Sequence, residues 1–198
     1  MSQVLPLSYY QNEQVVSLAK DLLGKYIFAN TGNRLTGGII TETEAYAGVT
    51  DKASHAYGGR RTARTEIMYH SGGVSYVYFT YGMHHLFNIV TGKEGVPHAI
   101  LIRAIFPTEG IETMFQRTGK SKANYNLTNG PAKLTKAMGI TREQNGIELT
   151  GKIIWLEDRG IVVDDKDVSA TPRIGIDYAG EDAKLPYRFV LNYKNYMP

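Results

Sequence analysis

The chain has 198 residues, of which 42% are hydrophobic and 21% charged. This composition suits one globular domain, or at most two small ones, and excludes a largely disordered chain. The absence of cysteine excludes disulfides, thiolate catalysis and cysteine-bound metals, while the net charge of +3 permits a polyanionic partner without requiring one. We find no secretory signal and no apolar stretch long enough to cross a bilayer, so we expect an intracellular protein with no membrane partner.

Periodicity, caps and breakers predict three helices and seven strands. The helices run from the Asn12 cap to Gly24, from Glu109 to Arg117, and from Pro131 to near Gly139. The strands are expected at residues 25–28, 38–46, 75–81, 88–91, 99–106, 153–157 and 187–192. Three segments are expected to be irregular: a long loop at 47–73, a mobile segment at 120–128 and a polar loop at 164–171. Without a βαβ rhythm, this mixture predicts the α+β class.

Two carboxylates share one face of the strand at residues 38–46. Alternation places four side chains on that face: Ile40, Glu42, Glu44 and Tyr46. Arg103 interrupts the apolar strand 99–106, and a buried guanidinium needs an ionised partner, for which Glu44 or Glu42 is the candidate. The pair is either a structural ion pair or a carboxylate held ionised so that it orients and deprotonates water.

The strand at residues 75–81 is rich in tyrosine. Tyr76 and Tyr78 share one face, and Tyr81 precedes Gly82, so it can project from a turn. The tyrosines either pack across strands or form a stacking wall for a base with a wedge beside it.

Basic residues are grouped at two places. Arg60, Arg61 and Arg64 follow two glycines, and Lys133 lies in the first turn of the helix that opens at Pro131. Backbone phosphates would fit these residues, although a solvated basic surface explains the arginines equally well.

Other chemistries lack a signature. None of the five histidines has a recognised metal-ligand spacing, and the chain contains no GxGxxG. We therefore expect no metal and no cofactor.

Six segments together resemble the alkyladenine (3-methyladenine) DNA glycosylase family, the type without a helix-hairpin-helix. They are Glu42–Tyr46, Asp51–His55, Tyr76–Asn88, Leu101–Ala104, Gly130–Leu134 and, more weakly, Arg173–Gly180. The resemblance covers nearly the whole chain. It implies one α+β domain over residues 1–198, with a curved, mainly antiparallel sheet, surrounding helices and a protruding β-hairpin.

The resemblance also implies residue roles. Glu44 matches the water-activating carboxylate, and Arg103 and the main-chain carbonyl of Ile174 match the groups that help to hold the water.

Five further positions match residues that handle the nucleotide. Tyr46, His55 and Tyr78 match the base-stacking residues, Tyr81 the side chain inserted into the duplex, and Asn88 the residue that screens purines by their exocyclic group.

These roles imply a monofunctional DNA glycosylase, active as a monomer on duplex DNA, that flips out a damaged purine for water attack at C1′. Its expected substrates are 3-methyladenine, 7-methylguanine, hypoxanthine and ethenoadenine. Two alternatives stay open: an N-glycosidase of nucleosides or sugars that uses Glu42 and Glu44 as a carboxylate pair, and a nucleic-acid-binding module without catalysis.

Overall fold

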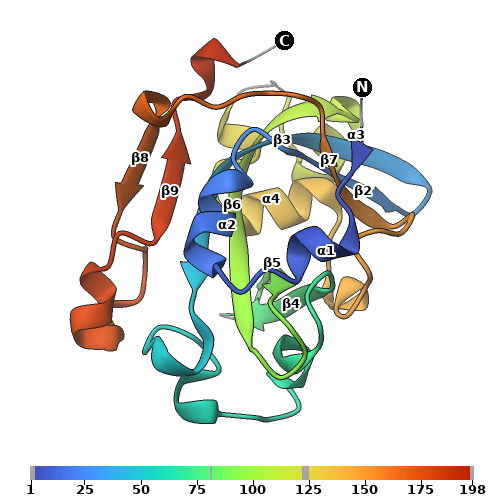
Figure 1. The fold of residues 1–198 in the computed structure, drawn as a ribbon. Helices are drawn as coiled ribbons and strands as arrows, with labels where there is room; N and C mark the ends of the chain where they lie inside the picture. The colour runs from blue at the N-terminus through green and yellow to red at the C-terminus, as the bar shows by residue number, and fades with distance from the viewer. Residues whose placement is uncertain (1–2, 81, 122–124, 197–198) are drawn as a thin grey trace.

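The computed structural model describes residues 3–80, 82–121 and 125–196. Within these ranges nine strands form one sheet, and every strand pairing is antiparallel. The path through the sheet is β1-β7-β2-β3-β6-β5-β4, with β9 paired to β3 and β8 paired to β9. Figure 1 shows short helices lying against this sheet. The expected α+β class with a mainly antiparallel sheet is confirmed.

The strands are β1 (Gln3–Val4), β2 (Tyr26–Thr31), β3 (Arg34–Tyr46), β4 (Ser75–Thr80), β5 (His84–Thr91), β6 (His98–Glu109), β7 (Ile154–Asp158), β8 (Val168–Thr171) and β9 (Arg188–Leu191). The α-helices are α1 (Leu7–Tyr10), α2 (Val15–Asp21), α3 (Ile111–Thr118) and α4 (Pro131–Met138). The long loop after β3 contains three short 3₁₀ turns, at Gly48–Thr50, Tyr57–Gly59 and Glu66–Tyr69.

Each expected helix and strand is present, with ends shifted by a few residues. The expectation of a polar loop at 164–171 is partly wrong, because Val168–Thr171 forms β8. The side chains of β8 are half-buried or exposed, so its sequence lacks the hydrophobic alternation that predicts a strand. The short elements β1 and α1 were not expected. Asn12 is not the N-cap of α2, although its side chain accepts a hydrogen bond from the N–H of the actual cap, Gln14.

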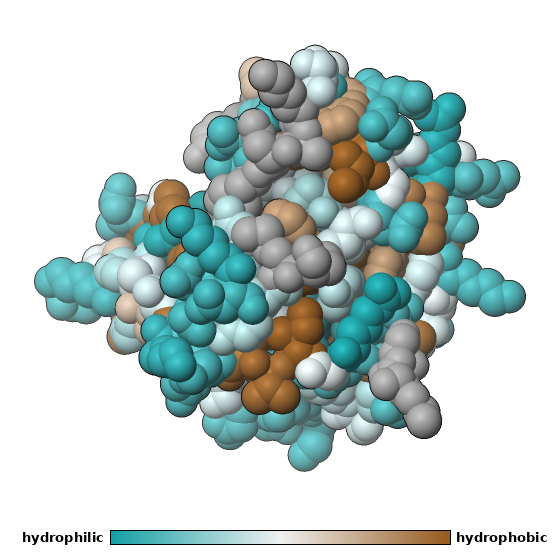
Figure 2. Space-filling view, turned by 90° about the horizontal axis from the view of Figure 1, so that it is seen from above, coloured by the Kyte–Doolittle hydropathy of each residue, from teal (hydrophilic) through white to brown (hydrophobic). Residues whose placement is uncertain are grey.

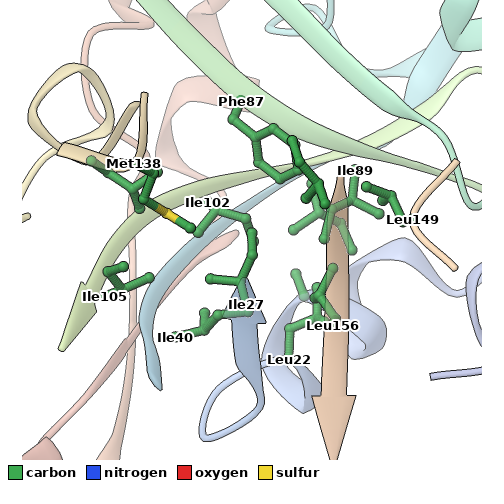
Figure 3. Close-up of a cluster of buried hydrophobic side chains, with 14 of the residues drawn as sticks. Leu22, Ile27, Ile40, Phe87, Ile89, Ile102, Ile105, Met138, Leu149 and Leu156 are labelled. Carbon is green, nitrogen blue, oxygen red and sulfur yellow. The ribbon is translucent and has the colours of Figure 1, made fainter. Parts of the chain in front are cut away.

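The main hydrophobic core gathers buried side chains from α2, α4 and one face of the sheet. In Figure 3, Ile40 lies close to Ile27 and Ile105 within this cluster. Glycine ends α4, since Gly139 adopts the left-handed conformation, with φ of 68°, that other residues avoid.

Paired irregularities lie where β3 meets β6. The register slips by one residue after Ile40 and slips back after Glu42, which leaves Thr41 unmatched on β3 and Arg103 unmatched on β6. An extra residue reverses which face the following side chains occupy. The expectation that Ile40 shares a face with Glu44 is therefore wrong: Ile40 belongs to the core, and Glu44 lies on the other face.

The strand β3 is long enough to be paired twice along one edge. Its first half pairs with β2 and its second half with β9, while β6 pairs along the opposite edge. Glu42 and Glu44 thus lie inside the sheet, between β6 and β9. This position explains why both carboxylates are buried.

The surface seen from above in Figure 2 is mostly hydrophilic, with separate smaller hydrophobic patches. Such scattered patches are ordinary on folded proteins. Among the helices of the described ranges, none has the length and apolar character needed to cross a membrane.

Candidate active site

Glu44 has no exposed surface, and three groups contact its carboxylate. Oε1 accepts a hydrogen bond from the N–H of Ile174 at 2.8 Å and lies 3.3 Å from Nη1 of Arg103. Oε2 accepts a hydrogen bond from the Tyr46 hydroxyl at 2.8 Å. A buried carboxylate needs such donors to stay ionised. Within the described part of the chain Oε2 has one donor, whereas a carboxylate oxygen can accept two.

Glu42 holds two arginines. Its Oε1 accepts hydrogen bonds from Nε of Arg103 and from Nε of Arg188, each at 2.7 Å. Arg103 therefore contacts both carboxylates that the sequence offered as its partner. Burial by itself lowers the pKa of Arg103, but Glu44 and Glu42 raise it overall, so the guanidinium stays charged. Arg188 was not predicted from the sequence.

A cavity of about 400 Å³ lies beside Glu44, and its walls include all three residues that contact the carboxylate: Tyr46, Arg103 and Ile174. The wall also contains most of the aromatic residues considered above, namely His55, Tyr76 and Tyr78, together with Asn88. A volume of this order suits a small ligand.

Neither Glu42 nor Glu44 is itself among the cavity-lining residues. The predicted base-binding residues line the cavity together with Arg103 and Ile174, and Glu44 lies behind this wall, bonded to three of its residues. Tyr81 lies outside the described residues.

His55 is held as a neutral ring. Its Nε2 lies 3.3 Å from Nη2 of Arg64, and its Nδ1 lies 2.9 Å from the Tyr76 hydroxyl. A guanidinium can only donate, so Nε2 accepts and Nδ1 carries the proton. Burial, aided by the positive charges of Arg64 and Arg60, lowers the pKa of His55 to about 4. The ring is therefore uncharged at neutral pH.

The flat wall of the cavity is formed by Tyr78. The His55 ring meets it edge-on with centroids 4.7 Å apart, and the Arg64 guanidinium lies 5.0 Å from its centroid. Burial is the main cause that raises the pKa of Tyr78, so its hydroxyl stays protonated. Asn88 is buried and donates from Nδ2 to the main-chain carbonyl of Tyr76 at 3.1 Å. This bond fixes the orientation of the Asn88 amide at the wall.

A buried ion pair that the sequence reasoning missed supports this wall. Arg173 donates from Nη2 to Oδ1 of Asp51 at 2.8 Å and from Nη1 to the carbonyl of Ala45 at 2.8 Å. Its guanidinium lies 4.8 Å from the centroid of the Tyr46 ring. Asp51 also accepts from the N–H of Ala47. Both residues fall inside the segments that carry the family resemblance, which is the only sequence signal for them.

The predicted phosphate contacts have different surroundings. Arg61 forms a two-bond ion pair with Glu66, at 2.6 and 2.9 Å, and Arg64 lines the cavity. Arg60 is exposed, and Lys133 donates to the side chain of Asn129 at 3.0 Å on the surface. Arg60 and Lys133 are therefore better placed than the other two to meet a phosphate in the free protein.

No cluster of three or more His, Asp or Glu side chains within the described ranges could hold a metal ion. The expectation that no metal or cofactor is needed stays a prediction.

Known proteins match this chain over most of its length. The family model of methylpurine-DNA glycosylases matches residues 8–195. A Chlamydia felis protein is 47% identical over 192 residues, which cover 96% of this chain and 97% of that protein. A protein of Bacillus cereus (strain AH820) is 44% identical over 195 residues, with 93% of each chain covered. Both are provisionally named 3-methyladenine DNA glycosylase. The chain belongs to the methylpurine-DNA glycosylase family, and it is a hydrolase of N-glycosyl bonds in DNA repair.

Proposed function

We propose that the protein removes alkylated or deaminated purines from duplex DNA, as the first step of base excision repair. The substrates are 3-methyladenine, 7-methylguanine, hypoxanthine and ethenoadenine. The damaged nucleotide is flipped into the cavity, where the base stacks between Tyr46 and Tyr78 together with His55. Asn88 screens the exocyclic group of the base.

In this mechanism Glu44 aligns water and removes its proton as the water attacks C1′. The observation that carries the proposal is that the three residues bonded to the Glu44 carboxylate, namely Tyr46, Arg103 and Ile174, all line the cavity, so that the carboxylate lies directly behind its wall. The sugar gains positive charge as the bond to the base breaks, and a nearby carboxylate favours that charge. The additional role of the Ile174 carbonyl in holding the water is part of the proposal.

The β4–β5 hairpin gives the duplex a central contact. Met83, near the hairpin turn, is 68% exposed, and we propose that Tyr81 enters the minor groove and fills the space that the flipped base leaves. Thr135 of α4 donates to the main-chain carbonyl of His85 at 2.7 Å, which ties the hairpin to the helix that carries Lys133.

Basic groups lie near the hairpin. The loop that contains Arg60, Arg61 and Arg64 contacts β4, where the Arg64 guanidinium lies over the Tyr78 ring, and a groove of about 520 Å³ lies between β5 and α4. The groove contains Lys133 and Lys136, and no acidic residue among the described residues that line it. We propose that Arg60, Arg61, Arg64 and Lys133 contact phosphates on the two sides of the flipped nucleotide. Arg61 must then exchange its bond with Glu66 for a phosphate.

No lysine of the described residues lines the cavity, which supports base release without strand cleavage. Of the two arginines that hold Glu42, Arg103 lines the cavity and Arg188 does not, whereas the three residues bonded to Glu44 all line it. This difference weighs against a reaction that uses Glu42 and Glu44 as a pair. We propose one catalytic domain over residues 1–198, acting as a monomer on intracellular DNA.

The decisive experiment compares the wild type with Glu44→Gln on duplexes that carry each lesion and on free nucleosides. We expect wild-type base release from at least one lesion duplex, and a loss of about 10²–10⁴-fold in single-turnover rate in Glu44→Gln with retained duplex binding. Glu157→Gln is the matched control, because Glu157 is also buried but lies on β7 and pairs with Arg159. Release from free nucleosides alone would favour the nucleosidase alternative, and release from no duplex would refute the proposal.

A further inference from the structure

Arg188 is not among the cavity-lining residues; it lies opposite Glu44 on the neighbouring strand β9, and its guanidinium bonds to Glu42. We propose that Arg188 is a positioning residue, which neutralises Glu42 so that Arg103 remains able to hold Glu44 in its ionised form. This inference rests on the glycosylase function proposed above, in which Glu44 is the base.

The strand order brings the charged groups together. β6 supplies Arg103 on one side of β3, and β9 supplies Arg188 on the other. Both arginines donate from Nε to the same oxygen of Glu42, and Arg188 is fixed further because its Nη1 donates to the Thr171 hydroxyl of β8 at 3.1 Å. The side chain of Arg188 is only 23% exposed, so water does little to weaken this arrangement.

Arg103 divides its contacts unequally. It donates to Glu42 at 2.7 Å, whereas its Nη1 lies 3.3 Å from Glu44. Two carboxylates and two guanidiniums leave the cluster neutral. Without Arg188 a single guanidinium would serve both carboxylates, and the nearer Glu42 would compete more strongly for it. A like charge so close disfavours ionisation of the pair, so one carboxylate would take up a proton at a higher pH.

The other groups around Glu44 do not change in this comparison. Tyr46 lies beside it on β3, Tyr78 faces it from β4, and Arg173 lies nearby in the segment before Ile174. The positive charge of Arg173 is balanced by its ion pair with Asp51. Replacing Arg188 therefore leaves the negative charge of Glu42 without the guanidinium that balances it, while the other charges around Glu44 stay the same.

The test is the pH dependence of single-turnover base release, measured on a duplex with an alkylated purine. Arg188→Met should move the acid limb of the profile upward by about one pH unit, which is about a tenfold loss of rate on that limb and little loss at higher pH. Arg188→Lys, which restores the charge, should return the limb toward the wild type. The double variant Glu42→Gln with Arg188→Met should also return it, because the unbalanced charge is gone.

Arg159→Met is the control. Arg159 also pairs with a largely buried carboxylate, Glu157, but on β7, so its profile should match the wild type. Thermal unfolding of every variant separates loss of fold from loss of positioning. An equal loss for Arg188→Met at every pH, or a double variant that keeps the shifted limb, would overturn the inference. Absence of base release by the wild type would instead refute the proposed function, and this inference with it.

Discussion

Breaking the buried pair between Asp51 and Arg173 should destabilise the protein strongly. The side chains are 2% and 0% exposed, and Asp51→Ala would leave the guanidinium without its counter-ion. Loss of one partner of a buried pair costs about 3–5 kcal/mol, which for a chain of this size lowers Tm by roughly 6–20 °C. The N–H groups of Ala47 and Ala53, which Asp51 also accepts from, would lose a bond as well.

Thermal and urea unfolding of Asp51→Ala, Arg173→Met and the double variant would measure this cost. The double variant should recover part of the stability, because neither charge is then buried alone. Glu66→Ala is the control: it breaks the Arg61 pair, whose side chains are 56% and 50% exposed, and should leave the unfolding free energy nearly unchanged because solvent screens an exposed pair. An Asp51→Ala protein that is as stable as this control would refute the reasoning.

Three further predictions concern the cavity and the DNA surface. Tyr46→Phe keeps the stacking ring but removes the hydroxyl that donates to Glu44; since a hydrogen bond to a charged group contributes about 1.5–3 kcal/mol, single-turnover base release should fall roughly tenfold to hundredfold, and an unchanged rate would refute that role. The folded pKa of His55 is lowered from 6.5 to about 4, so its contribution to stability is complete above pH 6.5 and is lost as pH falls toward 4. At 1.36 kcal/mol per pH unit, the protonation of His55 lowers the unfolding free energy of the wild type by at most about 3 kcal/mol. Between pH 6.5 and 4, His55→Gln should therefore lose less unfolding free energy than the wild type, by up to this amount. If Lys136 contacts a phosphate, Lys136→Ala should lower the slope of log K against log salt for duplex binding by about one. An unchanged slope would show that Lys136 is not part of the surface of the protein that binds DNA.

The central elements of the site follow from the sequence by simple arguments. An arginine within a continuous apolar strand must be buried and must find a carboxylate, and alternation along a neighbouring strand offers Glu42 and Glu44. The structure adds that both accept this role, because Arg103 has enough donors to contact two carboxylates at once. Sequence reasoning could not choose between them, since the choice depends on which carboxylate is bonded to more of the cavity-lining residues.

The paired irregularities between β3 and β6 could not be predicted. They depend on how two strands match across the sheet, and neither strand contains a proline or an isolated glycine next to Thr41 to mark the site. For this reason the alternation argument fails at Ile40 and holds from Glu42 onward. The partners Arg173 and Arg188 were missed for a similar reason: both follow from long-range pairing near the C-terminus, where the strands are only four residues long.

The arrangement also explains how the carboxylate of Glu44, which we propose is the base, can be buried in the middle of a sheet. Burying an ionised group is costly unless donors replace water, and Glu44 receives them from β3, β6 and the segment before β9. Each donor is itself fixed by another contact: Tyr46 by the Arg173 guanidinium over its ring, Arg103 by Glu42, and the segment that contains Ile174 by the ion pair of its neighbour Arg173. Little reorganisation is then needed when charge develops on the substrate. The contacts that make the fold of this region costly to disrupt are the contacts that prepare Glu44 for its proposed role, so stability and catalysis should fail together at Asp51 but separately at Tyr46.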